Sequence, residues 1–195
     1  MLSKFIQAYP PSPSVRPITT DEFAPYAGVV SPGVEELWKE HGFGKYGGGL
    51  FEVVEPWTYE ASIYPWIFRD EKKRYVPLIM TAFGILFYQR QLNNPAMPNF
   101  TRDFQRLDPH YANVVHAVFE DDEFFNAYLL NDEIRVSELN VDKWQQALAA
   151  GLAKPALGEI FCYTPALVMG GDGAAATCSL GNAVVHFALL RSMRA

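Results

Sequence analysis

If the chain were a hydrolase, its four histidines would be the candidates for the catalytic base. Covalent hydrolysis needs a nucleophile, a base and an acid that orients the base. His41 ends an apolar helical pattern, and His116 and His186 lie within apolar runs. Those positions favour packing over catalysis, and His110 has no adjacent motif that assigns it a role. The sequence contains neither a G-x-S-x-G elbow nor an H-E-x-x-H pair. It therefore predicts no catalytic residue.

The two cysteines have surroundings that do not predict reactive thiols. Cys162 stands between two aromatic residues in an expected strand, which favours a small buried side chain. Cys178 is expected to be exposed, and it has no charged neighbour that would lower the pKa of its thiol. One pair, sixteen positions apart, makes neither a disulfide framework nor a metal site, so a reducing cytoplasm is the expected location.

Two glycine-rich segments resemble phosphate-binding loops only superficially. The segment 42–49 lacks the Lys-Ser/Thr ending of a P-loop, and Gly170–Gly173 opens no dinucleotide fingerprint. Tight turns that need positive φ explain both better. One alternative stays open, in which Gly170–Gly173 and Glu159 form a small-molecule-binding or hydrolytic site. The adjacent acids Asp121 and Asp122 would point to different faces of a helix, so neither a metal nor a cofactor is expected.

Nearly all of the net charge of −6 lies in one segment, from Glu120 to Asp142. This segment has eight acidic side chains and only Arg135 as a base, which gives −7, whereas the rest of the chain carries +1. Nucleic-acid binders concentrate basic residues instead, so direct binding of nucleic acid is not expected. The acidic segment is either a solvated helix face or a surface for a basic protein.

The elements expected in the first half of the chain include several strands. A short helix over 3–9 precedes a proline-rich connector, Thr20 caps a second helix, and Ser31 followed by Pro32 starts a third that ends at Gly42. Strands are expected over 50–54, 75–82, 83–90 and 100–107, with an aromatic helix or loop over 57–66 and a surface loop over 93–98.

The second half is expected to be richer in helices. Residues 111–119 fit a strand or a helix equally well. Asp121 or Asp122 caps one helix and Asn140 caps another, each with an apolar stripe at i, i+3, i+4 spacing. Short strands are expected over 159–163 and 166–169, and an apolar stretch over 183–193 closes the chain.

Length and composition fit a globular protein of 195 residues, 49% of them hydrophobic. We predict an α+β protein of two packed subdomains, a sheet-rich part over 1–105 and a helix-rich part over 106–195. No apolar run is long enough to span a membrane, and residues 1–15 lack the apolar core of a signal peptide. The sequence does not predict an oligomeric state.

Two stretches resemble known domains, in the order and spacing of one family. Residues 37–46 (LWKEHGFGKY), 49–51 (GLF) and 81–87 (TAFGILF) resemble the bacterial GAD-like domain, which the 1–105 part is expected to form. Residues 157–193, centred on GEIFCYTPALVMGG, are similar to the C-terminal domain found behind GAD-like domains in type VI secretion immunity proteins, which the 106–195 part is expected to form.

The resemblance implies a cytoplasmic immunity protein, without enzymatic activity, that binds a DNase toxin and keeps it harmless to sister cells. The residues of these motifs are expected at core and turn positions, so the resemblance implies no catalytic residue. It does not locate the binding surface either. From charge and aromatic content we expect that surface to include acids of the charged segment and aromatics of the 57–66 segment: Glu120, Asp121, Asp122, Glu123, Asp132, Glu133, Trp57, Tyr59 and Trp66.

Overall fold

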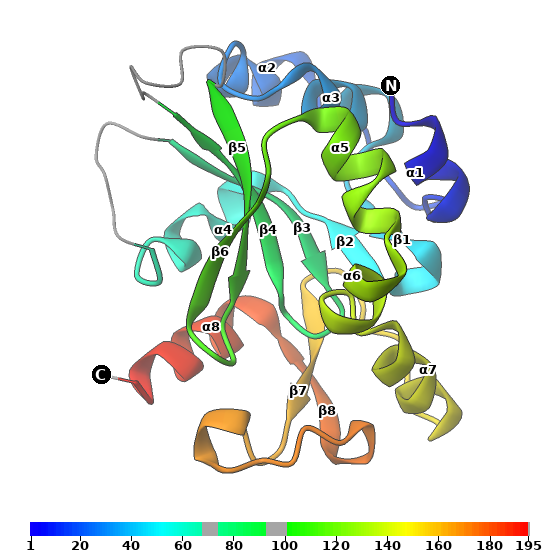
Figure 1. Cartoon of the computed structure of the whole chain (residues 1–195), viewed down its shortest axis with the longest axis vertical. Coiled ribbons are helices and arrows are strands. Elements are labelled where there is room, and N and C mark those ends of the chain that lie inside the picture. The colour runs from blue at the N-terminus through cyan, green and yellow to red at the C-terminus, as the bar shows by residue number, and fades with distance from the viewer. Residues whose placement is uncertain (68–73, 93–100, 195) are drawn as a thin grey trace.

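A six-stranded antiparallel sheet forms the centre of the molecule (Figure 1). The computed structural model describes residues 1–67, 74–92 and 101–194. Each strand pairs with the next one along the chain, so the sheet is a meander of β1 (Gly44–Tyr46), β2 (Phe51–Val53), β3 (Tyr75–Thr81), β4 (Leu86–Gln91), β5 (Arg102–Asp108) and β6 (Asn113–Val118). A separate hairpin joins β7 (Glu159–Tyr163) and β8 (Cys178–Asn182). The expected loop over 93–98 lies outside the described residues.

Helices cover both faces of the sheet, which is why β3 is buried along its whole length and reads as a continuous apolar run. The first face packs against α1 (Ser3–Ala8), α2 (Thr20–Phe23), α3 (Pro32–Glu36), α5 (Asp121–Asn126) and α7 (Val141–Ala149). The second face packs against α4 (Pro56–Ile63) and α8 (Ala183–Ser192). A short exposed helix, α6 (Asp132–Ser137), follows α5. This mixture of eight α-helices and two sheets in the described residues confirms the α+β class.

The expected split into two subdomains is not visible as two separate cores. Residue 105 lies inside β5, and Phe104 of this strand stacks on Phe124 of α5 with ring centroids 4.1 Å apart. The amide of Phe161 in β7 donates to the carbonyl of Ala82 beside β3 at 2.7 Å. Both parts of the chain therefore contribute to the same apolar core. The boundary at 105 stays a prediction.

Three element boundaries differ from expectation for local reasons. Thr19, not Thr20, caps α2, because its hydroxyl accepts from the amide of Glu22 while the Glu22 carboxylate accepts from the amide of Thr19. The N-cap of α5 is Glu120, so Asp121 is already the first helical residue. Residues 167–169 form a 3₁₀ turn in place of the expected strand.

The helix that begins at Pro32 changes its winding before it ends. Residues 37–41 form a π-helical turn, in which the amide of Gly42 donates to the carbonyl of Leu37 at 2.8 Å. Gly42 then takes a φ of +83°, and a Cβ at this position would lie 2.5 Å from the backbone of Arg16. A glycine is therefore required for the chain to turn away here.

Within the described residues, every helix falls short of the length and apolar character that crossing a bilayer requires.

Candidate functional site

Most of the predicted acidic residues are exposed, on α5, on α6 or at the residue before α5. These residues, here together called the acidic surface, are Glu120, Asp122, Glu123, Asp132 and Glu133. A shallow groove of about 350 Å³ runs between β6, α5 and α6. Glu123 and Glu133 stand at this groove, and Val118, Tyr128 and Ile134 supply apolar lining. Charge at the rim and apolar side chains in the groove are the combination that protein interfaces use.

Four of these acids lie in the first turns of the two helices. Asn131 caps α6, and its side-chain oxygen accepts from the amides of Glu133 and Ile134. Acidic residues in the first turn of a helix interact favourably with its dipole, so this position stabilises them without burying them.

Asp121 was expected on this surface, but it is half-buried and its carboxylate is hydrogen-bonded to the start of α3. One carboxylate oxygen accepts from the amide of Gly33 at 2.9 Å, and the other accepts from the hydroxyl of Ser31. Gln89 of β4 in turn donates to the Ser31 hydroxyl at 2.7 Å. Asp121 therefore caps α3 from α5, in place of the Ser31 side chain that the sequence suggested.

Glu138 is a second acid of the charged segment with a structural role. Its carboxylate pairs with Arg106 of β5, and both side chains are largely buried. Burial raises the pKa of Glu138, against the opposing effect of Arg106. The surface charge is accordingly smaller than the −7 of the segment.

The predicted aromatic residues lie on α4 and its C-terminal extension, on the second face of the sheet. Trp57 is 38% exposed, whereas Trp66 packs edge-on against Phe187 of α8. Tyr59 is only 2% exposed, so its ring is buried, and its part in toxin binding stays a prediction. The acidic and aromatic sets are carried by helices on opposite faces of the sheet.

The residues of the alternative site are not brought together. Glu159 begins β7 and its carboxylate accepts from the amide of Ala156, whereas Gly170–Gly173 follow the far end of this strand. At the usual rise per residue the two ends of β7 are roughly 13 Å apart. Asp172 accepts from the amide of Ala174 at 2.9 Å, which is the geometry of a structural turn and lowers the pKa of Asp172.

Cys178 and two of the histidines are buried, and Cys162 is half-buried. Cys178 is buried, contrary to expectation, because β8 pairs with β7 and turns it into the core. Burial raises the pKa of both thiols to about 11, so both stay protonated. The rings of His110 and His186 pack 5.6 Å apart. Within the described chain, His110 Nδ1 and His186 Nε2 are buried without a hydrogen-bond partner.

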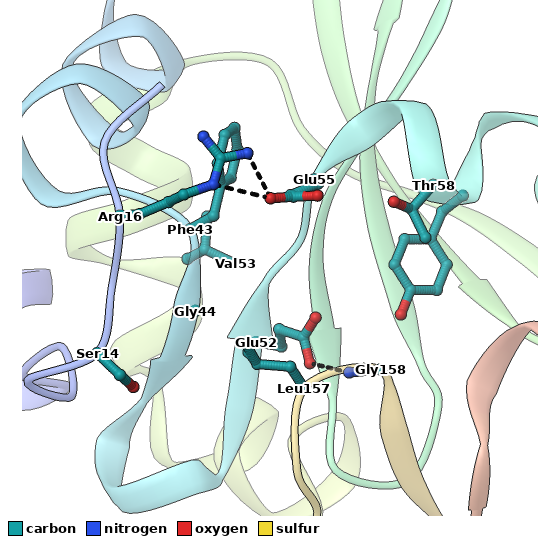
Figure 2. A pocket seen from close by; sticks show the side chains of 11 residues that line it. Ser14, Arg16, Phe43, Gly44, Glu52, Val53, Glu55, Thr58, Leu157 and Gly158 are labelled. Atoms are coloured by element: carbon teal, nitrogen blue, oxygen red, sulfur yellow. Dashed lines mark hydrogen bonds and ion pairs between the residues drawn. The ribbon is translucent and has the colours of Figure 1, made fainter. Parts of the chain in front are cut away.

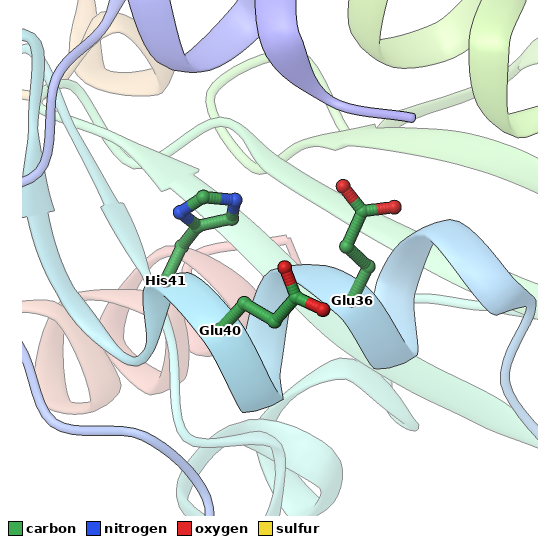
Figure 3. A group of neighbouring side chains, drawn as sticks. All are labelled: Glu36, Glu40 and His41. Carbon is green, nitrogen blue, oxygen red and sulfur yellow. The ribbon is translucent and has the colours of Figure 1, made fainter.

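One group in the described chain has the composition of a metal site: Glu36, Glu40 and His41 (Figure 3). The π-helical turn places positions i, i+4 and i+5 on one side of the helix, so their ligand atoms lie within 4.8 Å of one another. Glu36 already accepts from the amino group of Met1 and the amide of Leu2, both at 3.1 Å. This contact gives the cluster a structural role, and we assign no metal to it.

A cavity of about 320 Å³ lies where β1, β2 and the start of α4 meet the segment that leads into β7 (Figure 2). Glu52, Glu55 and Arg16 line it. Sequence reasoning missed this site, because its residues come from four separate segments and form no motif.

Comparisons with known proteins agree with the architecture. Residues 1–94 match the GAD-like domain, and residues 120–194 match the domain described as "T6SS immunity protein Tdi1, C-terminal". The chain therefore has a GAD-like domain followed by a T6SS immunity protein Tdi1 C-terminal domain. The resemblance of the sequence to type VI secretion (T6SS) immunity proteins is thus confirmed. The two matched ranges flank β5 and β6, which complete the sheet between them.

The fold of this chain is also found in a solved structure. It is similar to "Crystal structure of Atu4351 from Agrobacterium tumefaciens", with a TM-score of 0.71 and 13% sequence identity over 98% of this chain and 88% of that chain. At this identity the similarity concerns the fold alone. No curated protein matches the chain.

Proposed function

We propose that this immunity protein binds a nuclease toxin, a DNase, in the cytoplasm and neutralises it without catalysing a reaction. The match to the T6SS immunity protein Tdi1 C-terminal domain supports the binding of a toxin delivered by the type VI secretion system. The observation that carries the nuclease assignment is the acidic surface on α5 and α6. A DNase presents basic residues to the phosphates of DNA, so an acidic surface complements it.

The acidic surface serves the rate of association more than the lifetime of the complex. Complementary charge steers two proteins together and raises the association rate towards ~10⁸ M⁻¹s⁻¹ at low salt. Slow dissociation needs an apolar anchor that is shielded from water. The groove beside Tyr128 and Ile134 offers a place for such an anchor from the toxin.

A nuclease titration tests the proposal directly. The cognate toxin is mixed with increasing amounts of the full-length immunity protein, and cleavage of plasmid DNA is measured together with complex formation. We expect cleavage to stop near an equimolar ratio, and co-expression to rescue cells that produce the toxin. A toxin that degrades a substrate other than DNA would overturn the nuclease assignment, and a toxin that is bound but remains active would overturn neutralisation.

A further inference from the structure

The cavity of about 320 Å³ in Figure 2 is assembled from both matched domains. Ser14, Arg16, β1, β2 and α4 supply most of its wall, and Leu157 and Gly158 close it from the C-terminal domain. Leu157 is 61% exposed, which is unusual for a leucine. The volume lies near the lower limit for ligand pockets, so the cavity fits a group the size of an amino-acid side chain.

Oxygen atoms without partners line this cavity. Glu52 is 6% exposed, and its Oε2 accepts from Lys45 Nζ at 2.8 Å and from the amide of Gly158 at 3.0 Å. Its Oε1 has no partner among the described residues. Likewise, Glu55 Oε1 accepts from Arg16, whereas Oε2 of the same carboxylate has no described partner. Figure 2 shows the Glu55 carboxylate directed towards Arg16 and the Glu52 carboxylate directed towards Gly158.

The hydroxyl of Tyr59 is the third of these oxygens. Tyr59 lines the cavity and is 98% buried, yet its hydroxyl makes no hydrogen bond within the described chain. A Cβ on Gly158 would lie 3.8 Å from this hydroxyl oxygen, which places the oxygen next to the amide that Glu52 binds. The hydroxyl oxygen is accessible from the cavity, so it can accept a hydrogen bond from a ligand that supplies a donor there.

The chemistry of these groups specifies the ligand. Carboxylate oxygens accept hydrogen bonds, so the ligand must donate, and a donor that carries a positive charge makes the stronger hydrogen bond to a carboxylate. The nearby cations Arg16 and Lys45 already bind these same carboxylates. Phe43, Val53 and Leu157 form apolar wall, which suits a hydrocarbon stem.

We propose that this cavity binds a guanidinium group carried on a short apolar stem. A planar guanidinium has five N–H donors in a fixed fork, so it has a donor for each of Glu52 Oε1, Glu55 Oε2 and the Tyr59 hydroxyl. Two sources share this chemistry: an arginine side chain of a bound protein and a free small guanidinium compound. The binding chemistry does not depend on the proposed function.

The test is a titration of the full-length protein with n-butylguanidinium, followed through the amide NMR signals of Gly44 and Gly158. n-Butylurea is the matched control probe, because it has nearly the same shape without the charge. We expect saturable shifts of both signals with the guanidinium and at least tenfold weaker binding of the urea. Equal binding of the two probes, or shifts without saturation, would overturn the proposal.

Variants then test the individual oxygens. Tyr59→Phe removes only a hydroxyl that bonds to no described residue, so the fold should be retained while the dissociation constant for butylguanidinium rises about threefold or more. Glu55→Gln should raise the constant about tenfold, and Glu40→Gln, away from the cavity, should leave it unchanged. Unchanged binding in both Tyr59→Phe and Glu55→Gln would overturn the assignment. Glu52→Gln is left out of the test, because the Glu52 carboxylate also accepts a hydrogen bond from the amide of Gly158.

A competition experiment distinguishes the two sources. If saturating toxin displaces butylguanidinium from the cavity, the natural occupant is an arginine of the partner. If the complex with the toxin still binds the probe, the occupant is a free compound. Both results require the cavity to bind guanidinium. If the protein did not bind the toxin, the proposed function would be contradicted. The butylguanidinium titration of the free protein would still test the cavity.

Discussion

The carboxylate of Asp121 accepts a hydrogen bond from the backbone amide of Gly33, a residue 88 positions earlier in the chain, at 2.9 Å. A Cβ on Gly33 would lie 2.7 Å from Asp121 Cγ, so only a glycine lets α5 approach α3 so closely. The first turn of α3 is thus capped by a side chain from the C-terminal half of the chain. The hydrogen bonds of Asp121 thus connect the two halves of the chain, and both of its carboxylate oxygens are already engaged within the protein.

Asp121→Ala should therefore lower the free energy of unfolding. It leaves the amide of Gly33 without its acceptor, and losses of this kind cost about 1 to 3 kcal/mol. Asp122→Ala is the matched control, because Asp122 is exposed and its described hydrogen bond is to Asn126 one turn later. Urea unfolding of both variants checks the prediction, and equal midpoints would show that the cap contributes nothing.

Trp38→Ala should destabilise the fold more strongly. Trp38 is fully buried between Tyr26 and Phe43, with ring centroids 5.3 Å and 5.6 Å away. Truncating a large buried aromatic costs about 3 to 5 kcal/mol. Trp38→Phe, which fills most of the space, should cost less and gives a measurable midpoint if the alanine variant does not fold. A Trp38→Ala midpoint equal to that of the parent would mean that the indole is exposed in solution.

Stability should fall as the pH is lowered through the range in which His186 would take up a proton. Burial, and then the neighbouring His110, lower the pKa of His186 to about 4. The unfolded chain binds this proton near pH 6.5, so acid favours unfolding and the stability present above pH 6.5 is lost as the pH falls to about 4. The loss due to His186 between pH 8 and pH 5 is roughly 2 kcal/mol.

Replacing this histidine separates its effect from that of the carboxylates. His186→Phe should flatten the decline in the free energy of unfolding between pH 8 and pH 5. The salt-bridged Glu22 has a pKa of about 2, and its contribution is lost only below its ordinary pKa of 4.5. Identical pH profiles for the parent and His186→Phe would contradict the assignment.

Reversing two charges at the groove should slow association with a basic toxin. Glu123→Lys combined with Glu133→Lys changes both acids at the groove, and neither side chain has a described partner. At low ionic strength we expect roughly a tenfold slower association rate and a flatter dependence on salt. Stopped-flow mixing at several salt concentrations measures both quantities.

An equal change of net charge elsewhere is the control for that experiment. Asp21→Lys with Glu40→Lys alters two exposed acids away from α5 and α6. This pair should retain most of the parent's association rate. Circular dichroism confirms folding, since the loss of acids from first helical turns costs up to about 1 kcal/mol each. Equal effects of the two pairs would show that only the total charge matters.

Local patterns predicted much of the fold, and failed where an element depends on distant partners. The apolar runs of β3 and β4 and the Ser31-Pro32 helix start are visible in the sequence. The helix α6 has no buried residue and therefore no apolar stripe to detect. The strand β8 (CSLGN) lacks the β-branched residues typical of strands and exists because β7 pairs with it.

The candidate site was predictable in the same limited way. Charge clustering indicated an exposed acidic surface on α5 and α6, but local sequence does not distinguish Asp121 from its exposed neighbour Asp122. Nor does it distinguish Tyr59 from Trp57, because the burial of Tyr59 depends on the C-terminal helix that packs over the same face of the sheet.

Because both halves of the chain contribute to the core, the protein can complete its folding only late in its synthesis. The strands β1 to β4 leave the ribosome first, yet one of their faces awaits Phe124 and Phe161, and the other awaits Phe187. A nascent chain that stops short of α8 leaves apolar sheet uncovered, which is a route to aggregation. The core can therefore close only after α8 has left the ribosome, and a chain truncated before Phe187 should fold incompletely.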